Sequence, residues 1–363
     1  MGAALPTERR SRGDIDPMNG ALWRRIKGMF AWIVMGGLLL YGIWPWLPLH
    51  AQAALPRTIV FYGFSILDHS ITRDVFPAFR KRWSAMSHED VEMISSFAGS
   101  GTVTNQIIMG VPVELALLAL EADAQRLADA NVVPSGSWRQ LPHDGVVNRT
   151  PIVILVRPGN PKNIRDFADL ARPGIGVVHP DPLTSGAANW AIAAEYGAGQ
   201  RAHPDDPEAG YRMLLGIWRN VVAQAASARA ARTQFDLGFG DALITYEQEG
   251  LWDQARDKLH GEIVYPRSTI LTEHTLVVVG RNVSPREKPM LDSLAAFLWS
   301  ESAQRMFVHN GFRSVNDELV REDSAFGHVP DPFFIADLGG WKRVKKEIVD
   351  GVWRDRVLQE IDR

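Results

Sequence analysis

Residues 150–190 have the sequence TPIVILVRPGNPKNIRDFADLARPGIGVVHPDPLTSGAANW. An uninterrupted apolar run at 151–156 predicts a buried strand, which stops at a dense cluster of turn residues at 157–161. A short helical pattern at 164–170 and a second strand pattern at 174–178 follow. A helix is then predicted at 187–196, directly after Thr184, Ser185 and Gly186. This alternation of strand and helix is typical of an α/β protein.

The same alternation extends over the chain from residue 57 onward. Further strands are predicted at 58–63, 91–94, 115–120, 242–246 and 275–279, and further helices at 73–83, 287–307 and 341–361. The turn cluster at 157–161 suits a crossing between two lobes. We therefore expect two α/β lobes: residues 57–150 and 270–363, with the C-terminal helices, in lobe one, and residues 151–269 in lobe two.

Composition limits the functional classes. The 363 residues are 46% hydrophobic and 22% charged, as in a globular protein long enough for one large or two medium domains. The formal net charge of -3 lacks the basic excess that nucleic-acid binding requires. The chain has no cysteine, which excludes disulfides, thiolate metal sites, a cysteine nucleophile and a lipid-modified N-terminal cysteine.

The N-terminal region carries a membrane-directed pattern. A basic cluster of Arg24, Arg25 and Lys27 precedes residues 28–49, which hold no charge. One interpretation is a secretory signal cleaved after the Ala-Gln-Ala sequence at 51–53. The other is an uncleaved anchor, because this apolar run is long enough for about 30 Å of hydrocarbon. Under both interpretations the basic cluster stays in the cytoplasm, and the chain after residue 53 lies in the periplasm.

Residues 148–190 resemble the sulfate/thiosulfate-binding proteins of ABC importers. Those proteins have the same order of strand, R-x-G-N-P, short helix, strand, N-P-x-x-S-S-G-G and helix. Collinear matches extend over essentially all of the chain after the N-terminal segment: ITRDVF (71–76), SSFAGSG (95–101), GFGDALITYEQE (238–249), PRSTILTEHTLVVV (266–279), WSESAQ (299–304), LGGWKR (338–343) and DGVW (350–353). The resemblance implies a two-lobed periplasmic-binding-protein fold of type II with the ligand in the interlobe cleft. It also implies a sulfate or thiosulfate ligand, an ABC permease of the inner membrane as partner, a monomer and no cofactor.

Two turns of the sequence suit an anion. A fully ionised tetrahedral dianion carries no proton, so its site should offer donors, above all backbone N–H groups at helix N-termini. Ser100 and Gly101 lie between a predicted strand and a helical run, so we expect their amides and the serine hydroxyl to point at an anion. Ser185, Gly186 and Ala187 repeat the arrangement. For each serine the alternative is a plain helix N-cap. The resemblance places both turns at the ligand.

Three further candidates come from the resemblance. The small-Ala-Arg turn of the family maps to Ser227, Ala228 and Arg229, which implies that the Ala228 amide binds oxygen and that Arg229 supports the site. Tyr246 replaces the tryptophan whose indole donates in the family, and a phenol can accept as well as donate. Ala187 replaces a glycine, although alanine keeps the backbone donor. The alternatives are a surface arginine and a tyrosine that ends a core strand.

The first loop allows two alignments. The family contributes an aspartate amide from a Ser-Tyr-Asp-Pro-Thr-Arg loop. Anchoring on Thr72 and Arg73 selects Ser70, and anchoring on the acidic residue selects Asp68. If Asp68 turned its carboxylate inward, it would repel a dianion and favour a protonated oxyanion such as hydrogen phosphate.

The sequence gives no support for an enzyme. Neither Ser100 nor Ser185 lies in a G-x-S-x-G elbow, and the histidines lack the His-x-x-x-His spacing of metal ligands. We therefore expect neither catalysis nor a metal. The main alternative is a receptor of the same fold for molybdate, phosphate or an organic anion, because Ala98, Ala187 and Tyr246 depart from the family pattern.

Overall fold

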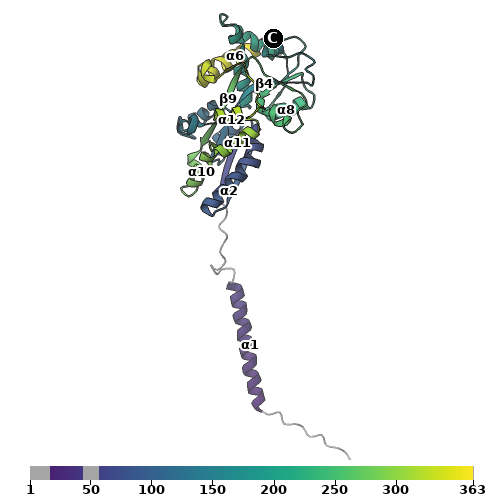
Figure 1. The fold of residues 1–363 in the computed structure, drawn as a ribbon. Coiled ribbons are helices and arrows are strands. Elements are labelled where there is room, and N and C mark those ends of the chain that lie inside the picture. Colours follow the sequence, from purple (N-terminus) through teal and green to yellow (C-terminus); the bar gives the residue numbers. More distant parts are fainter. Residues whose placement is uncertain (1–16, 44–56, 363) are drawn as a thin grey trace, which may run out of the picture. The chain divides into compact units, whose positions relative to one another are not determined.

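The computed structural model describes residues 17–43 and 57–362 (Figure 1). Helix α1 (Pro17–Ile43) exposes apolar side chains along its length, among them Trp32, Leu38 and Leu40. Within the described residues, no helix is both long and apolar enough to cross a membrane. The predicted cleavage site at 51–53 and the end of the apolar run at 44–49 lie outside the described residues.

The chain from residue 57 onward is built on eleven strands. They are β1 (Arg57–Phe64), β2 (Val91–Ala98), β3 (Leu115–Leu118), β4 (Val146–Val156), β5 (Val177–Pro180), β6 (Val221–Ala225), β7 (Ala242–Tyr246), β8 (Glu262–Val264), β9 (Ser268–Val278), β10 (Arg313–Ser314) and β11 (Asp331–Phe333). The main path has the order β2-β1-β3-β9-β4-β7-β5-β6. Pairing is parallel for β1 with β2 and β3, and for β5 with β6 and β7. Each strand predicted from the sequence is present, and the predicted α/β class is confirmed.

Strand β4 connects the two halves of this sheet. It pairs antiparallel with β9 up to Pro151, and with β7 from Ile152 onward. The turn cluster at 157–161, which was expected to suit a crossing between lobes, lies after this change of partner. That cluster follows the end of β4, where Gly159 and Asn160 take positive φ values of 73° and 44°. A strand that changes partners halfway along connects two half-sheets without leaving extended structure.

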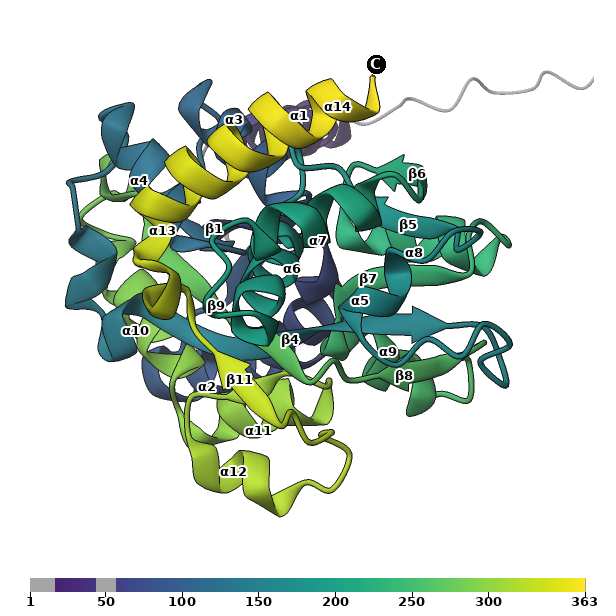
Figure 2. The same ribbon diagram turned by 90° about the horizontal axis from the view of Figure 1, so that it is seen from above.

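Helices cover both half-sheets (Figure 2). They are α2 (Phe76–Ser87), α3 (Ser100–Ile108), α4 (Glu121–Asp129), α5 (Phe167–Leu170), α6 (Gly186–Ala202), α7 (Ala209–Trp218), α8 (Ala228–Asp236), α9 (Glu247–Gln254), α10 (Lys288–Leu298), α11 (Glu301–His309), α12 (Asp317–Glu322), α13 (Gly340–Arg343) and α14 (Gln359–Ile361). Shorter or wider turns are η2 (Ser65–Leu67), the π-helix η3 (Ser70–Val75), η4 (Ser137–Gln140), η5 (Pro142–Gly145), η6 (Gly280–Asn282), η7 (Ile335–Leu338) and the π-helix η8 (Val344–Leu358). Aliphatic and aromatic side chains of the strands and of α6 form the core.

Three helices begin just beyond the carboxyl ends of parallel strands. Helix α3 follows β2, α6 follows β5 and α8 follows β6. In open α/β sheets, ligands bind at this edge, because helix N-termini and connecting turns gather there. The fold therefore directs three helix N-termini toward one region.

Candidate functional site

The turns that precede α3, α6 and α8 contact one another. The Gly101 N–H donates to the Thr184 carbonyl oxygen at 3.1 Å. A methyl carbon placed on Gly99 would overlap the carbonyl oxygens of Thr184 and Ala226, and one placed on Gly186 would lie 3.1 Å from the Ser100 Cβ. Glycine is thus required where the three backbones approach most closely. Segments far apart in sequence therefore meet at one place.

The helix N-termini at this site offer backbone donors. The first N–H groups of a helix have no acceptor within the helix and favour an anion. Some have partners here: Ala188 donates to the Ser185 carbonyl at 3.2 Å, and Ala230 donates to the Ser227 hydroxyl at 3.2 Å. No partner outside the helix is found among the described residues for the N–H groups of Gly186, Ala187 and Ala228. These are three of the predicted ligand positions.

Ser185 does not act as the plain N-cap that was the alternative. It occupies the N-cap position of α6 and is 3% exposed, yet its side chain accepts no capping hydrogen bond. Ser227, at the same position of α8, does cap its helix through Ala230. The Ser185 hydroxyl therefore stays available to a ligand at the N-terminus of α6.

The hydroxyl of Ser100 is already hydrogen-bonded within the protein. It donates to Asp123 Oδ2 at 2.6 Å and accepts from the Ala119 N–H at 3.0 Å. Asp123 is 4% exposed, and burial raises the pKa of its carboxyl, opposed by the hydrogen bond from Ser100 and by Arg126. Ser100 consequently offers a ligand its backbone N–H, and the sequence-based expectation of a free hydroxyl at this position does not match the geometry.

Tyr246 supplies a buried donor. Its side chain is 0% exposed, and its hydroxyl has no hydrogen-bond partner among the described residues. Burial raises the pKa of the Tyr246 phenol well above its ordinary value, and the carboxylates of Asp123 and Glu249 raise it further. The hydroxyl thus keeps its proton across the physiological range. Leaving such a group unpaired costs about 1–3 kcal/mol, which a ligand that accepts its hydrogen bond would recover.

Removing this hydroxyl should change stability and affinity in opposite directions. We expect Tyr246→Phe to stabilise the ligand-free protein by about 1 kcal/mol, because a buried unpaired group disappears. It should weaken oxyanion binding by about tenfold, because one hydrogen bond is lost. Thermal unfolding with and without ligand measures both effects. A lower melting temperature in the absence of ligand would show that the hydroxyl has a partner in solution.

Arg229 is held beside the site by a buried carboxylate. Its Nε donates to Glu249 Oε1 at 2.9 Å, and its side chain is 39% exposed. Burial raises the pKa of Glu249, while Arg229 and Arg232 lower it. The guanidinium and carboxylate balance each other, so Arg229 orders the start of α8 and adds little net charge to the site.

The first loop enters the site through a residue that the sequence did not single out. Asp68 is exposed, and Ser70 is buried with its hydroxyl donated to the Leu67 carbonyl at 2.9 Å. Among the described residues, neither forms a hydrogen bond with the three turns, whereas Ser65 Oγ accepts from the Arg229 backbone N–H at 3.5 Å. Neither alignment of the loop selected Ser65, because one serine in a loop carries no signal of its own.

The sequence also missed Gly99, Thr184, Asp123 and Asn189. Gly99 is part of the Gly-Ser-Gly turn, so the motif did contain a signal for it. Asp123 resembles an ordinary acidic residue in the first turn of a helix, and nothing local marks it as buried. The Thr184 hydroxyl is another buried group without a partner in the described chain.

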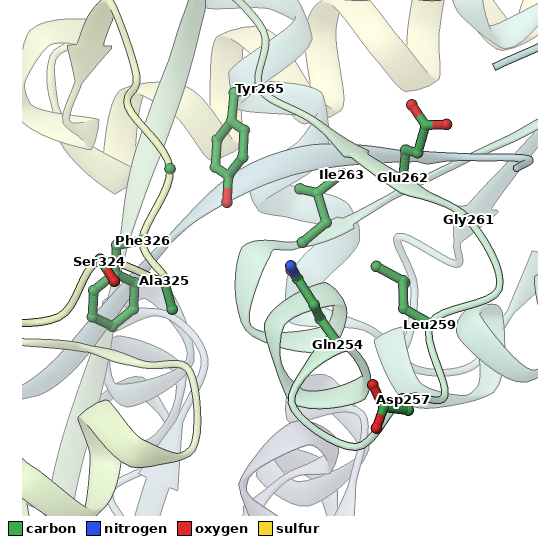
Figure 3. Close-up of a pocket in the computed structure, with 11 residues that line it drawn as sticks. Gln254, Asp257, Leu259, Gly261, Glu262, Ile263, Tyr265, Ser324, Ala325 and Phe326 are labelled. Carbon is green, nitrogen blue, oxygen red and sulfur yellow. The ribbon is translucent and has the colours of Figure 1, made fainter. Parts of the chain in front are cut away.

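Two cavities lie apart from these turns. One, of about 730 Å³, is lined by residues of α9, of the β8 region and of the 324–327 loop, with Gln254, Tyr265 and Phe326 facing it (Figure 3). The other, of about 690 Å³, is lined by His143, Trp299 and Asn316 among others. Neither contains a residue of the converging turns. The described residues hold no group of three potential metal ligands.

Comparisons with known proteins identify the family of this chain. The family model described as bacterial extracellular solute-binding protein matches residues 70–313. The sulfate-binding protein of Escherichia coli is 30% identical over 276 residues, which cover 74% of this chain and 83% of that protein. The thiosulfate-binding protein of Pseudomonas aeruginosa is 28% identical over 319 residues, which cover 85% and 93%.

A solved structure extends the likeness to the fold. The sulfate-binding protein SubI from Mycobacterium tuberculosis H37Rv superimposes with a TM-score of 0.73 at 29% identity, covering 80% of this chain and 99% of that one. The predicted fold, the two-lobed periplasmic-binding-protein fold of type II, is confirmed. The chain belongs to the bacterial extracellular solute-binding protein family.

Proposed function

We propose that this protein is an exported receptor that binds sulfate or thiosulfate and delivers it to an ABC permease of the inner membrane. The convergence of the α3, α6 and α8 N-termini supports this most directly, because it assembles backbone donors around one point. The Ser185 hydroxyl makes no capping bond and the Tyr246 hydroxyl has no partner among the described residues, so both are free to donate to such a ligand. The names of the E. coli and P. aeruginosa relatives support the same ligand class.

The export route and the lobes belong to the same proposal. The family is described as extracellular, which agrees with a signal segment that ends near residue 53. The change of partner along β4 between Pro151 and Ile152 supports a lobe boundary at 150/151. Lobe two then ends near residue 269, inside β9, and the ligand lies where the two lobes face each other.

A calorimetric titration tests the ligand. The purified protein should bind one equivalent of sulfate per chain and should prefer sulfate to phosphate by about tenfold or more. Hydrogen phosphate brings a proton that needs an acceptor, and leaving it unpaired costs about 1–3 kcal/mol, where about 1.4 kcal/mol is tenfold. Equal affinity for phosphate, or no binding of sulfate or thiosulfate, would refute the ligand assignment while leaving the fold intact.

A second candidate is a receptor for a protonated oxyanion such as hydrogen phosphate. The buried Asp123 carboxylate behind Ser100 favours it, as does the phenol of Tyr246, which can accept as well as donate. The hydrogen bond that Asp123 receives from Ser100 weighs against it, because that carboxylate oxygen is already used. The same titration with phosphate and molybdate distinguishes the candidates.

A further inference from the structure

The C-terminal segment packs against the helices that lie behind the Ser100 and Ser185 turns. After α13, which packs against α4, the π-helix η8 runs along α6 and α7 (Figure 2). Helix α4 carries Asp123, the carboxylate behind Ser100, and α6 begins at the Ser185 turn. Through α13 and η8, the C-terminal segment therefore contacts α4 and α6, the helices that lie behind the Ser100 and Ser185 turns.

Asn189 joins this helix to the Ser185 turn. Its side-chain Nδ2 donates to the carbonyl oxygens of Pro182 and Ser185, each at 3.2 Å. Its Oδ1 accepts from Lys345 Nζ at 3.3 Å, and the residue is 7% exposed. An amide has one donor end and one acceptor end, so the ammonium fixes which end faces the turn. The two carbonyl oxygens favour the same orientation, and loss of the ammonium would leave the Oδ1 end without its donor.

Lys345 also acts on the charge behind Ser100. Burial lowers the pKa of the Lys345 ammonium, while Asp350, at 3.9 Å, and Asp123 raise it. The ammonium in turn lowers the pKa of Asp123, after the larger effects of Ser100 and Arg126. A dianion bound at the turns brings negative charge toward Asp123. A cation held on the same side offsets part of that repulsion.

A second set of contacts connects the C-terminal segment with the Ser100 turn. Trp341, in α13, packs edge-on against Trp190 with ring centroids 4.5 Å apart. The Trp190 indole donates to the Ala119 carbonyl at 2.7 Å, and the Ala119 N–H donates to the Ser100 hydroxyl. Trp190 directly follows Asn189 in α6. The C-terminal segment thus reaches one ligand turn through Asn189 and the other through Trp190.

We propose that Lys345 is a positioning residue for oxyanion binding, which orients the Asn189 amide toward the Ser185 turn and compensates the buried Asp123 carboxylate. The proposal rests on the function proposed above. Lys345 does not need to touch the ligand. It acts through Asn189, whose side chain donates to the Pro182 and Ser185 carbonyl oxygens. This fixes the turn, so that the N–H groups of Gly186 and Ala187 point at the ligand.

Calorimetric titration of the full-length protein with sulfate tests the role of Lys345. We expect Lys345→Met to weaken sulfate binding by about tenfold, since about 1.4 kcal/mol corresponds to one decade and a charge-assisted hydrogen bond has about this worth. Lys346→Met is the matched control, because Lys346 is exposed on the same helix and the charge change is identical. Lys345→Arg should restore most of the affinity. Equal affinities of Lys345→Met and Lys346→Met would overturn the proposal.

Hydrogen exchange decides the proposal without a ligand. Backbone amides of residues 181–189 should exchange about tenfold faster in Lys345→Met than in Lys346→Met, because the turn loses its anchored amide. Equal exchange would overturn the role of Lys345. If the wild-type protein binds neither sulfate nor thiosulfate while this difference in exchange is present, the proposed function fails and the positioning role stands.

Discussion

Gly99→Ala should lower oxyanion affinity by about a hundredfold or more, corresponding to about 2.7 kcal/mol. A methyl group at this position would overlap the carbonyl oxygens of Thr184 and Ala226, closer than the 3.0 Å that real Cβ atoms respect. Both oxygens belong to the backbone, so no side-chain rotation relieves the overlap. The turns before α3, α6 and α8 would have to separate, and their N–H groups would no longer converge.

The backbone conformation of Gly99 excludes backbone strain as the cause of this expected loss of affinity. Its φ of −59° and ψ of 138° are available to alanine, so the substitution adds bulk without conformational strain. Gly280→Ala is the control, because no atom lies within 4 Å of a Cβ placed there. Sulfate titration of both variants, with melting temperatures alongside, measures the effect. Wild-type affinity in Gly99→Ala would mean that the ligand-bound turns stay further apart than in this structure.

Ser185→Ala should weaken binding by about ten- to a hundredfold. The loss is that of one hydrogen bond from the serine hydroxyl to an anion, about 1.5–3 kcal/mol. Since this hydroxyl caps no helix, the ligand-free protein should keep its stability, although replacing an N-cap serine ordinarily costs about 1 kcal/mol. The expected signature is lost affinity at unchanged melting temperature.

A capping serine elsewhere should show the reverse. Ser300 caps α11 by accepting from the Ala303 N–H at 3.3 Å, and it lies outside the converging turns. Ser300→Ala should therefore lower the free energy of unfolding by about 1 kcal/mol and leave sulfate affinity unchanged. If Ser185→Ala instead lost stability and kept its affinity, its hydroxyl would be a structural cap after all.

Local patterns were sufficient for the elements and for the candidate donors of the two turns at Ser100 and Ser185. Strand periodicity is a property of neighbouring residues, so β7 was predicted with the bounds it has, Ala242–Tyr246. The turns at Ser100 and Ser185 were visible as small residues between a strand and a helix. Their amides belong to the helix start, and a helix start can be recognised from sequence.

Only the tertiary structure decided how those donors are used. The fate of the Ser100 hydroxyl depends on Asp123, which comes from another helix, and the approach of Gly99 to Thr184 depends on the pairing of distant strands. The change of partner within β4 is equally invisible in the sequence, because a strand's apolar pattern does not tell which strand it pairs with.

The sequence by itself determined the α/β class, the order of strands and helices, and the resemblance from which a donor-lined oxyanion site is predicted. The structure decided that Ser65, rather than Asp68 or Ser70, accepts a hydrogen bond from the start of α8, and that Lys345 reaches the Ser185 turn through Asn189. The physical reason is the distance along the chain over which each interaction acts. Hydrogen-bonded periodicity is set within a few residues, whereas burial, partner choice and charge compensation arise between side chains that only folding brings together.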